Sequence, residues 1–227
     1  MVNLNVKEIL SNKLPFWSIL SKVDQNLLIE NTFYLKHKKG AFVYGTNKDC
    51  TGFLYVLDGT LRGYIMSEDG RDITLMRIFP KDMCILTASC ILNDMSLDFY
   101  LEAQSDTTLL NLDIMFIKKL SEKYPEIEAF AYKITTKRFG EAIKKIQEIL
   151  FYGIDKRIAR ALVNQSNEQK SELIKITHDS LAKDIGSVRE VVSRTLKYFE
   201  EEGILELSRG KVILLDSKKL KELANKK

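Results

Sequence analysis

The sequence contains few prolines, cysteines and histidines: 3 Pro, 3 Cys and 2 His among 227 residues. So few prolines, with 11 glycines, leave little room for a low-complexity linker. Three cysteines are an odd number in a chain long enough to fold without disulfides, so we expect a reduced, cytoplasmic protein. His37 is the one histidine of the strand-rich part, which argues against an enzyme built on clustered metal ligands there. No nucleophile–base triad is recognisable either, and we do not expect an enzyme.

Long hydrophobic runs are also missing. No stretch approaches the ~18 apolar residues of a membrane helix, and the first residues lack a basic segment followed by an apolar one. We therefore expect neither a membrane span nor a secretory signal. The sequence is nevertheless 45% hydrophobic, enough for real cores, and its length suits one large domain or two ordinary ones. A disordered or collagen-like chain is thereby excluded.

Positive charge is concentrated in the last third of the sequence. Residues 151–227 contain 16 basic and 12 acidic side chains, whereas residues 1–150 contain 19 of each. This excess suits a polyanionic partner, and it also suits an ordinary solvated surface. Charge alone does not decide between the two.

In the first half of the sequence, the predicted secondary structure changes from helices to strands near residue 32. Residues 6–31 predict short helices interrupted at Pro15. From residue 32 to 113, short runs of β-branched and aromatic residues alternate with glycine turns, which predicts a sandwich or barrel of about eight short strands. Residues 53–65 predict two strands around a tight turn, and Asp69-Gly70 predicts a hairpin.

A long helix is predicted after the strands. Residues 116–120 begin a helix that ends before Pro125, and residues 125–152 read as a second helix of ~28 residues, ~40 Å long. Its apolar residues recur at helical spacing: Phe130, Ile134, Ile143, Ile146, Ile149 and Leu150. Such a helix is too long to be covered by one small domain, so we expect a parallel dimer along it. The alternative is a helix packed wholly on its own domain.

The last third predicts a helical unit with a β-wing. Residues 157–163 predict a first helix and residues 164–171 a polar loop. Thr177 is suited to cap a second helix over residues 179–184. A third helix over 188–201 is followed by residues 204–215, which predict a two-stranded wing with Arg209-Gly210 at its tip.

Three residues at fixed spacing indicate a helix-turn-helix. Ala182 is small enough to lie between crossing helices, Gly186 suits the left-handed conformation of a tight turn, and Val192 is placed to face the first helix. In a helix-turn-helix the second helix enters the major groove of DNA. The alternative is a three-helix bundle without a DNA role.

The polar residues around the start of the third helix are the candidate DNA contacts: Ser187, Arg189, Glu190, Ser193 and Arg194. Arginine can bond the O6 and N7 atoms of guanine, and glutamate can accept from the N4 amine of cytosine. Two alternatives stay open. Ser187 and Glu190 also fit a capping box, and the arginines also fit phosphate contacts. Thr177, Lys183 and Lys197 are better suited to phosphate or solvent.

Residues 179–196 closely resemble the helix-turn-helix signature of CRP/FNR-type bacterial transcription regulators. The resemblance covers nearly the whole chain. It implies an α+β fold with an N-terminal β-jelly-roll sensor domain (residues 1–115), a dimerisation helix region (116–153) and a C-terminal winged helix-turn-helix (154–227). It also implies double-stranded DNA, a second copy of the chain and RNA polymerase as partners, and no membrane.

Within the family, the pattern Arg-Glu-x-x-x-Arg reads a guanine-containing half-site. The resemblance therefore implies base-reading roles for Arg189, Glu190 and Arg194. Ser193 matches the branch of the family that has serine immediately before the last arginine.

The sensor half departs from the cyclic-nucleotide pattern of the family. Relatives that bind cyclic AMP use a Gly-Glu pair and an Arg-Ser pair, which here fall on residues 85–86 (Ile-Leu) and 97–98 (Leu-Asp). A phosphate buried without its cation is costly, so we do not expect cyclic AMP to bind. No cysteine precedes Cys50, which excludes the N-terminal four-cysteine iron–sulfur cluster of another branch.

Cys84 and Cys90 lie where the ligand-binding cassette of the family is expected. They are candidates for an effector or redox site, either as a disulfide or as shared ligands of a soft metal. The alternative is two buried, small hydrophobic residues. We thus predict a homodimeric, sequence-specific DNA-binding regulator controlled by an effector or redox signal. The competing hypothesis is a cyclic-nucleotide-binding-like ligand module whose C-terminal domain mediates protein contacts.

Overall fold

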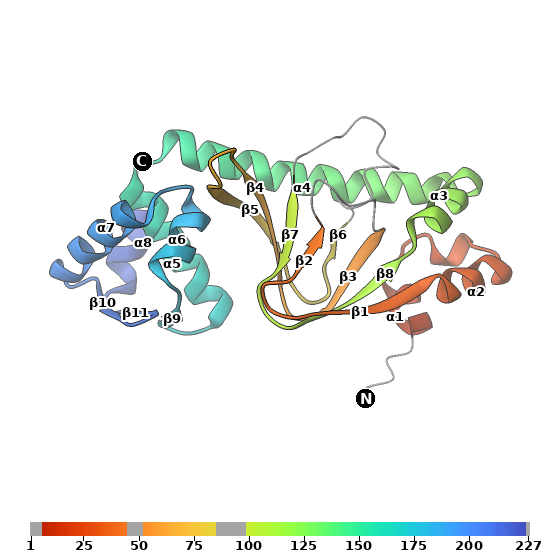
Figure 1. The fold of residues 1–227 in the computed structure, drawn as a ribbon, viewed down its shortest axis with the longest axis horizontal. Coiled ribbons are helices and arrows are strands. Elements are labelled where there is room, and N and C mark those ends of the chain that lie inside the picture. Colours follow the sequence, from red (N-terminus) through yellow and green to blue (C-terminus); the bar gives the residue numbers. More distant parts are fainter. Residues whose placement is uncertain (1–5, 45–51, 85–98, 226–227) are drawn as a thin grey trace. The chain divides into compact units, whose positions relative to one another are not determined.

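A computed structural model describes residues 6–44, 52–84 and 99–225 of the protein (Figure 1). The chain divides into two compact units. The first consists of residues 1–65 and 76–141, and the second of residues 66–75 and 142–227.

The first unit begins with the short helices expected around Pro15. They are α1 (Val6–Lys13), the 3₁₀ helix η1 (Trp17–Ile19) and α2 (Lys22–Glu30), and α2 packs against α3 (Ile114–Lys123) (Figure 1). The buried apolar side chains of these helices and of the residues between them join the core of the sheets: Leu10, Leu14, Phe16, Trp17, Leu20 and Leu28.

A buried carboxylate joins α2 to the end of α3. The Oδ2 atom of Asp24 accepts hydrogen bonds from the Ser21 hydroxyl (2.7 Å), the Lys123 ammonium (2.6 Å) and the Tyr124 hydroxyl (2.6 Å). The bonds from Lys123, Tyr124 and Ser21 lower the pKa of Asp24 to about 2. The ionised carboxylate therefore stabilises the folded state.

We expect Asp24→Asn to lower the free energy of unfolding by about 1–2 kcal/mol at neutral pH. The folded pKa lies below the ordinary aspartate value of about 3.9, so the stabilisation is complete above that value. It is lost as the pH falls through the folded pKa. Urea unfolding of both proteins at neutral pH and near pH ~3 measures this. A difference that stays constant between the two pH values would contradict the assignment.

Within the described residues, eight short strands lie between α2 and α3, as the turn spacing predicted. They are β1 (Thr32–His37), β2 (Phe42–Tyr44), β3 (Phe53–Asp58), β4 (Leu61–Met66), β5 (Asp72–Ile78), β6 (Met83–Cys84), β7 (Tyr100–Ala103) and β8 (Thr107–Leu112). They form two four-stranded sheets with the orders β1-β8-β3-β6 and β2-β7-β4-β5. This is the expected jelly roll.

The two predicted turns serve different connections. Asp58-Gly59 lies between strands of different sheets, so the chain crosses from one sheet to the other there. Gly59 has φ of +83°, and a Cβ atom in its place would lie 2.5 Å from the Asp106 carbonyl oxygen. Asp69-Gly70 joins β4 to its neighbour β5, which confirms the predicted hairpin. The Ser67 N–H closes this turn on the Arg71 carbonyl at 2.8 Å.

The long helix is present as predicted. Asp113 caps α3 by accepting a hydrogen bond from the Phe116 N–H at 3.0 Å, and α4 (Pro125–Phe151) follows. The buried residues of α4 are Ile127, Ala131, Thr135 and Arg138. Their spacing of three to four residues places them on one face of the helix.

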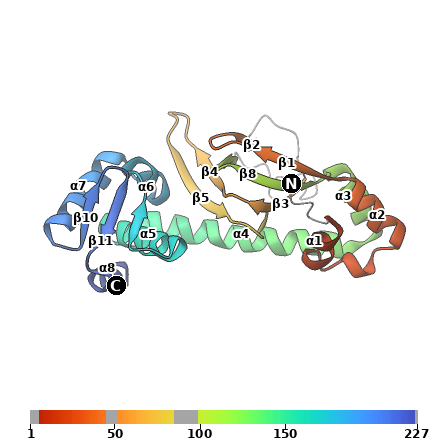
Figure 2. The same ribbon diagram turned by 90° about the horizontal axis from the view of Figure 1, so that it is seen from below.

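The second unit contains the winged helix-turn-helix (Figure 2). Its helices are α5 (Ile154–Gln169), α6 (His178–Ile185), α7 (Arg189–Glu201) and α8 (Ser217–Asn225). Its strands β9 (Leu173–Lys175), β10 (Leu205–Ser208) and β11 (Lys211–Leu214) form an antiparallel sheet in the order β10-β11-β9. The wing therefore has a third strand that was not predicted, because β9 is only three residues long and only Ile174 in it is buried.

The polar loop predicted over residues 164–171 is wrong. Helix α5 continues through Gln169 and ends at Lys170, which has φ of +48°. This segment contains no glycine or proline to end a helix, and the Gln169 amide donates to Gln165 at 3.0 Å. The polar residues there form a solvated helical turn rather than a loop.

Within the described residues, no helix combines the length and the apolar character needed to cross a membrane.

Candidate nucleic-acid interface

The helix-turn-helix has the geometry that its sequence predicted. Thr177 caps α6 by accepting a hydrogen bond from the Ser180 N–H at 3.1 Å. Gly186 has φ of +63° in the turn. Ala182 and Val192 are 3% and 0% exposed, so both lie in the small core between the helices.

Two contacts fix the turn from outside. A Cβ atom at Gly186 would lie 2.8 Å from the Ile149 Cδ1 atom, so α4 approaches the turn closely. Arg157 of α5 donates from Nη1 to the carbonyl oxygens of Ile185 (2.8 Å) and Gly186 (3.3 Å). Burial lowers the pKa of Arg157. Sequence reasoning missed this residue, because nothing near Arg157 in the sequence indicates a partner 28 positions away.

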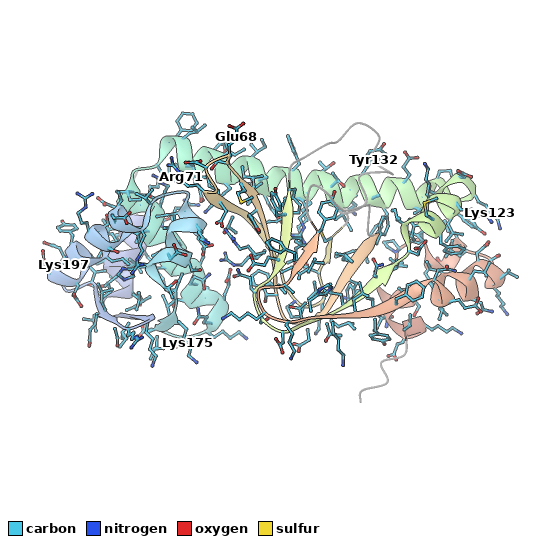
Figure 3. All side chains as sticks on the ribbon, viewed as in Figure 1. Glu68, Arg71, Lys123, Tyr132, Lys175 and Lys197 are labelled. Atoms are coloured by element: carbon cyan, nitrogen blue, oxygen red, sulfur yellow. The ribbon has the colours of Figure 1, made fainter. Side chains whose placement is uncertain are left out.

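Helix α7 separates its buried and exposed side chains cleanly. Its buried residues are Val192, Thr195, Leu196 and Phe199. Arg189, Glu190, Arg194 and Lys197 are exposed, and Ser193 is half-buried among them. Positions 189, 190, 193, 194 and 197 follow helical spacing, so they share one side of α7. Figure 3 shows Lys197 pointing away from the helix into solvent.

The capping box proposed for Ser187 and Glu190 is wrong. The N-cap of α7 is Val188, which makes no side-chain cap. The Ser187 N–H already donates to the Ala182 carbonyl at 2.9 Å, so the turn satisfies it. Glu190 is exposed at the first turn of α7 with no capping role, whereas Ser187 is half-buried before the helix.

Lys183 has two acidic neighbours. Its ammonium lies 3.1 Å from the Asp72 carboxylate and 3.7 Å from that of Asp179. Asp72 belongs to segment 66–75 of the same unit. A lysine paired in this way is a weaker phosphate ligand than the exposed Lys197.

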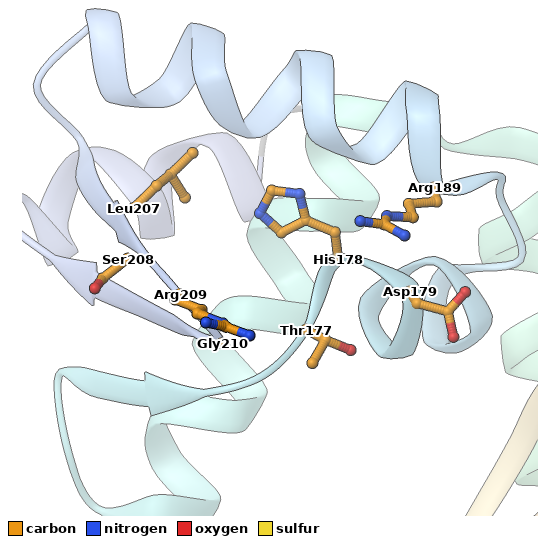
Figure 4. A pocket seen from close by; sticks show the side chains of 8 residues that line it. All are labelled: Thr177, His178, Asp179, Arg189, Leu207, Ser208, Arg209 and Gly210. Atoms are coloured by element: carbon orange, nitrogen blue, oxygen red, sulfur yellow. The ribbon is translucent and has the colours of Figure 1, made fainter.

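A hollow of about 590 Å³ opens between the starts of α6 and α7 and the tip of the wing (Figure 4). Its lining residues are Thr177, His178, Asp179, Arg189, Leu207, Ser208, Arg209 and Gly210. Arg189 and Arg209 bring two positive charges to it from two elements, against the one negative charge of Asp179. Such a hollow is suited to a phosphate of a nucleic-acid backbone.

His178 links the two helices at this hollow. Its Nδ1 atom lies 2.8 Å from the Ser193 hydroxyl oxygen. Burial and the nearby charge of Arg189 lower the pKa of His178 below its usual value, so the ring is neutral at neutral pH. Figure 4 shows the Arg189 guanidinium pointing towards the ring. Sequence reasoning missed His178, which follows the expected cap and carries no pattern of its own.

Comparison with known proteins identifies the family of this fold. A family model for the Crp-like helix-turn-helix domain matches residues 156–223. The transcriptional regulator SdrP of Thermus thermophilus is 30% identical over 175 residues, which cover 74% of this chain and 82% of SdrP. The chain belongs to the CRP/FNR family. A solved CRP/FNR-family transcriptional regulator from Eubacterium rectale is similar in sequence and fold, with 37% identity, a TM-score of 0.89 and coverage of 94% of this chain and 99% of that one.

As a CRP/FNR-family protein, the chain is a DNA-binding transcription regulator with a sensor domain, and not an enzyme. The family predicted from residues 179–196 is thereby confirmed, and so is the α+β fold of jelly roll, long helix and winged helix-turn-helix. The cyclic AMP receptor protein of Thermus thermophilus is 27% identical over 169 residues, which cover 74% of this chain and 77% of that protein.

Most of the predicted sensor residues lie outside the described part of this CRP/FNR-family chain. This holds for Cys50, for Cys90 and for the pairs at 85–86 and 97–98. Cys84 is described, and it is fully buried at the end of β6.

Around Gly63 in β4, the interior between the sheets is tightly packed. A Cβ atom at Gly63 would lie 2.9 Å from the Met76 Cγ atom and would also overlap the ring of Phe99. Phe99 and Met76 are buried, so they fill the space beside this strand.

Proposed function

We propose that this protein is a homodimeric regulator that binds DNA sequence-specifically by placing α7 in the major groove. The observation that carries the proposal is the exposed side of α7. Arg189, Glu190 and Arg194 lie there together, while the opposite side is held in the core of the unit. Two guanidinium groups and one carboxylate suit the donor and acceptor pattern of guanine and cytosine edges.

An apolar seam along α4 supports the dimer. We define the α4 seam as Tyr132, Phe139, Ile143, Ile146 and Leu150, which are 48%, 60%, 38%, 41% and 69% exposed. The positions alternate in steps of four and three once Thr136 is included, which is the heptad spacing of a coiled coil. Figure 3 shows Tyr132 projecting from the helix. The same seam on a second copy is the partner that fits it in a parallel pairing.

The candidate contacts with the DNA backbone lie at the hollow and on α7. Thr177, Arg209 and Lys197 are exposed at places where a DNA backbone beside α7 would run. We assign them to phosphates, which fix the position of the protein without reading sequence. A role for Ser187 in DNA binding and a contact with RNA polymerase stay predictions.

Selection from a pool of randomised DNA duplexes tests the proposed function. We expect the purified protein to enrich a two-fold symmetric sequence whose half-sites lie ~10 bp apart, centre to centre. Affinity for the selected sequence should fall steeply as salt is added, because the released counterions favour binding less at high salt. If no sequence were enriched, or if binding were insensitive to salt, the proposal would be contradicted.

We propose that the effector is not cyclic AMP. The Leu-Asp pair at 97–98 supports this, because it offers no cation to a cyclic phosphate. The same selection run with and without cyclic AMP should yield the same sequences at the same affinity. An increase in affinity with the nucleotide would overturn this part of the proposal. A redox or effector role of Cys84 and Cys90 stays a prediction, and the burial of Cys84 restricts the access of an oxidant to it.

A further inference from the structure

We propose that His178 is a positioning residue that decides how Ser193 reads its base, by joining the DNA backbone at the hollow to the Ser193 hydroxyl. The inference rests on the proposed function, because it specifies one contact of α7 in the major groove. It assigns a role to a residue outside the pattern of base-reading positions.

The two residues come from different helices of the helix-turn-helix. His178 is the first residue of α6 and Ser193 lies in the second turn of α7, and the 2.8 Å between Nδ1 and Oγ is a hydrogen bond. Within the described residues, this is the hydrogen bond found for the Ser193 side chain. Ser193 is half-buried, and its position lies on the side of α7 that carries the exposed Arg189 and Arg194.

The protonation of His178 determines what Ser193 can offer. In the protein without DNA, burial and the charge of Arg189 on α7 both disfavour the imidazolium, so the neutral ring carries one proton. Nδ1 of the ring is hydrogen-bonded to Ser193, so Nε2 is the polar atom left for another partner. The ring lines the hollow. A DNA phosphate in that hollow accepts hydrogen bonds and donates none. On the neutral ring, the phosphate therefore favours the tautomer with the proton on Nε2.

In that tautomer Nδ1 accepts, and the Ser193 hydroxyl must donate to it. The hydroxyl oxygen then offers only lone pairs to the DNA. It fits base edges that carry an exocyclic amine in the major groove, which are adenine N6 and cytosine N4. It does not fit guanine or thymine, whose edges at this level present acceptors. Without His178 the hydroxyl is able to rotate and serve as donor or acceptor, so the discrimination is lost.

The test compares variants by the base preference that each selects from the same randomised duplex pool. For the wild type we expect a preference of about tenfold for adenine or cytosine over guanine or thymine at one position of each half-site. His178→Phe keeps a flat ring but has no acceptor, and it should reduce this ratio to about twofold. His178→Asn restores an acceptor oxygen near the place of Nδ1, and it should retain most of the preference. Thermal unfolding of each variant confirms that the fold is kept.

A double-mutant cycle separates positioning from a direct contact. Ser193→Ala should abolish the preference, and His178→Phe combined with Ser193→Ala should select the same bases as Ser193→Ala alone. A preference unchanged in His178→Phe overturns the inference, as does an equal loss of affinity for every sequence, which would make His178 a phosphate ligand only. A wild-type pool without any enriched sequence would instead overturn the proposed function itself.

Discussion

Ile146→Glu is expected to turn the protein into a monomer and to weaken its binding to the selected DNA by at least ~100-fold. Ile146 lies in the α4 seam and is 41% exposed in the single chain. In a parallel dimer each position of the seam faces its own copy, so two carboxylates would be brought together in an apolar contact. The association that depends on this contact would fail.

The loss of DNA affinity follows from the loss of the dimer. Two linked helix-turn-helix units bind the second half-site as an intramolecular event, which adds roughly 10²–10⁴ to the affinity of one unit. Sedimentation gives the oligomeric state, and a DNA titration with the selected duplex gives the affinity.

Gln147→Glu is the matched control. It adds the same charge one residue further along the exposed part of α4, about 100° around the helix from Ile146. It should stay dimeric and bind DNA almost as the wild type does. If Ile146→Glu sedimented as a dimer with unchanged affinity, another surface would have to be the dimer contact.

The parts that the sequence predicted well depend on local rules. Gly186 was predicted from its place between two apolar helices, and its φ of +63° agrees with that. Asp69-Gly70 was predicted as a hairpin because the residues on both sides favour strands. The long helix α4 followed from apolar spacing between Pro125 and Gly153. Each of these signals is contained within a few turns of chain.

The parts that the sequence could not predict depend on long-range contacts. The hydrogen bond between His178 and Ser193 joins residues 15 positions apart, and that between Arg157 and Ile185 spans 28. Neither bond is indicated by a local sequence pattern, because the packing of the helices determines which polar side chains come within hydrogen-bonding distance. The Ser187 N–H, which a capping box would have bonded to Glu190, donates instead to the Ala182 carbonyl within the turn.

The same difference between local signals and long-range contacts applies to the strands of the first unit. The Gly59 turn was correct as a turn, but whether it joins paired strands or crosses between sheets is a property of the whole jelly roll. The packing of Phe99 and Met76 on Gly63 likewise brings together three strand-region segments distant in sequence. The packing of the sheets therefore depends on the folded arrangement, whereas the pattern of the helix-turn-helix is contained in one short segment.

Arg194→Ala is expected to cost about 1–3 kcal/mol of DNA affinity and to relax specificity at one guanine of each half-site. Arg194 is exposed on the side of α7 opposite the buried Leu196 and Phe199, so its removal leaves the core intact. A bidentate bond from its guanidinium to the O6 and N7 atoms of guanine discriminates that base from the other three. Its loss should therefore weaken binding to the selected sequence far more than binding to random DNA.

Lys197→Ala provides the comparison on the same helix. Lys197 is exposed one turn further on, and we assign it to a phosphate. Its removal should weaken binding to all sequences about equally and reduce the salt dependence by the equivalent of ~1 phosphate contact. Titrations of both variants against the selected duplex, against single-base changes in each half-site and against random DNA measure the difference. If Arg194→Ala weakened all these duplexes equally, as Lys197→Ala should, then Arg194 would contact phosphate, and the guanine of the half-site would be read by Arg189.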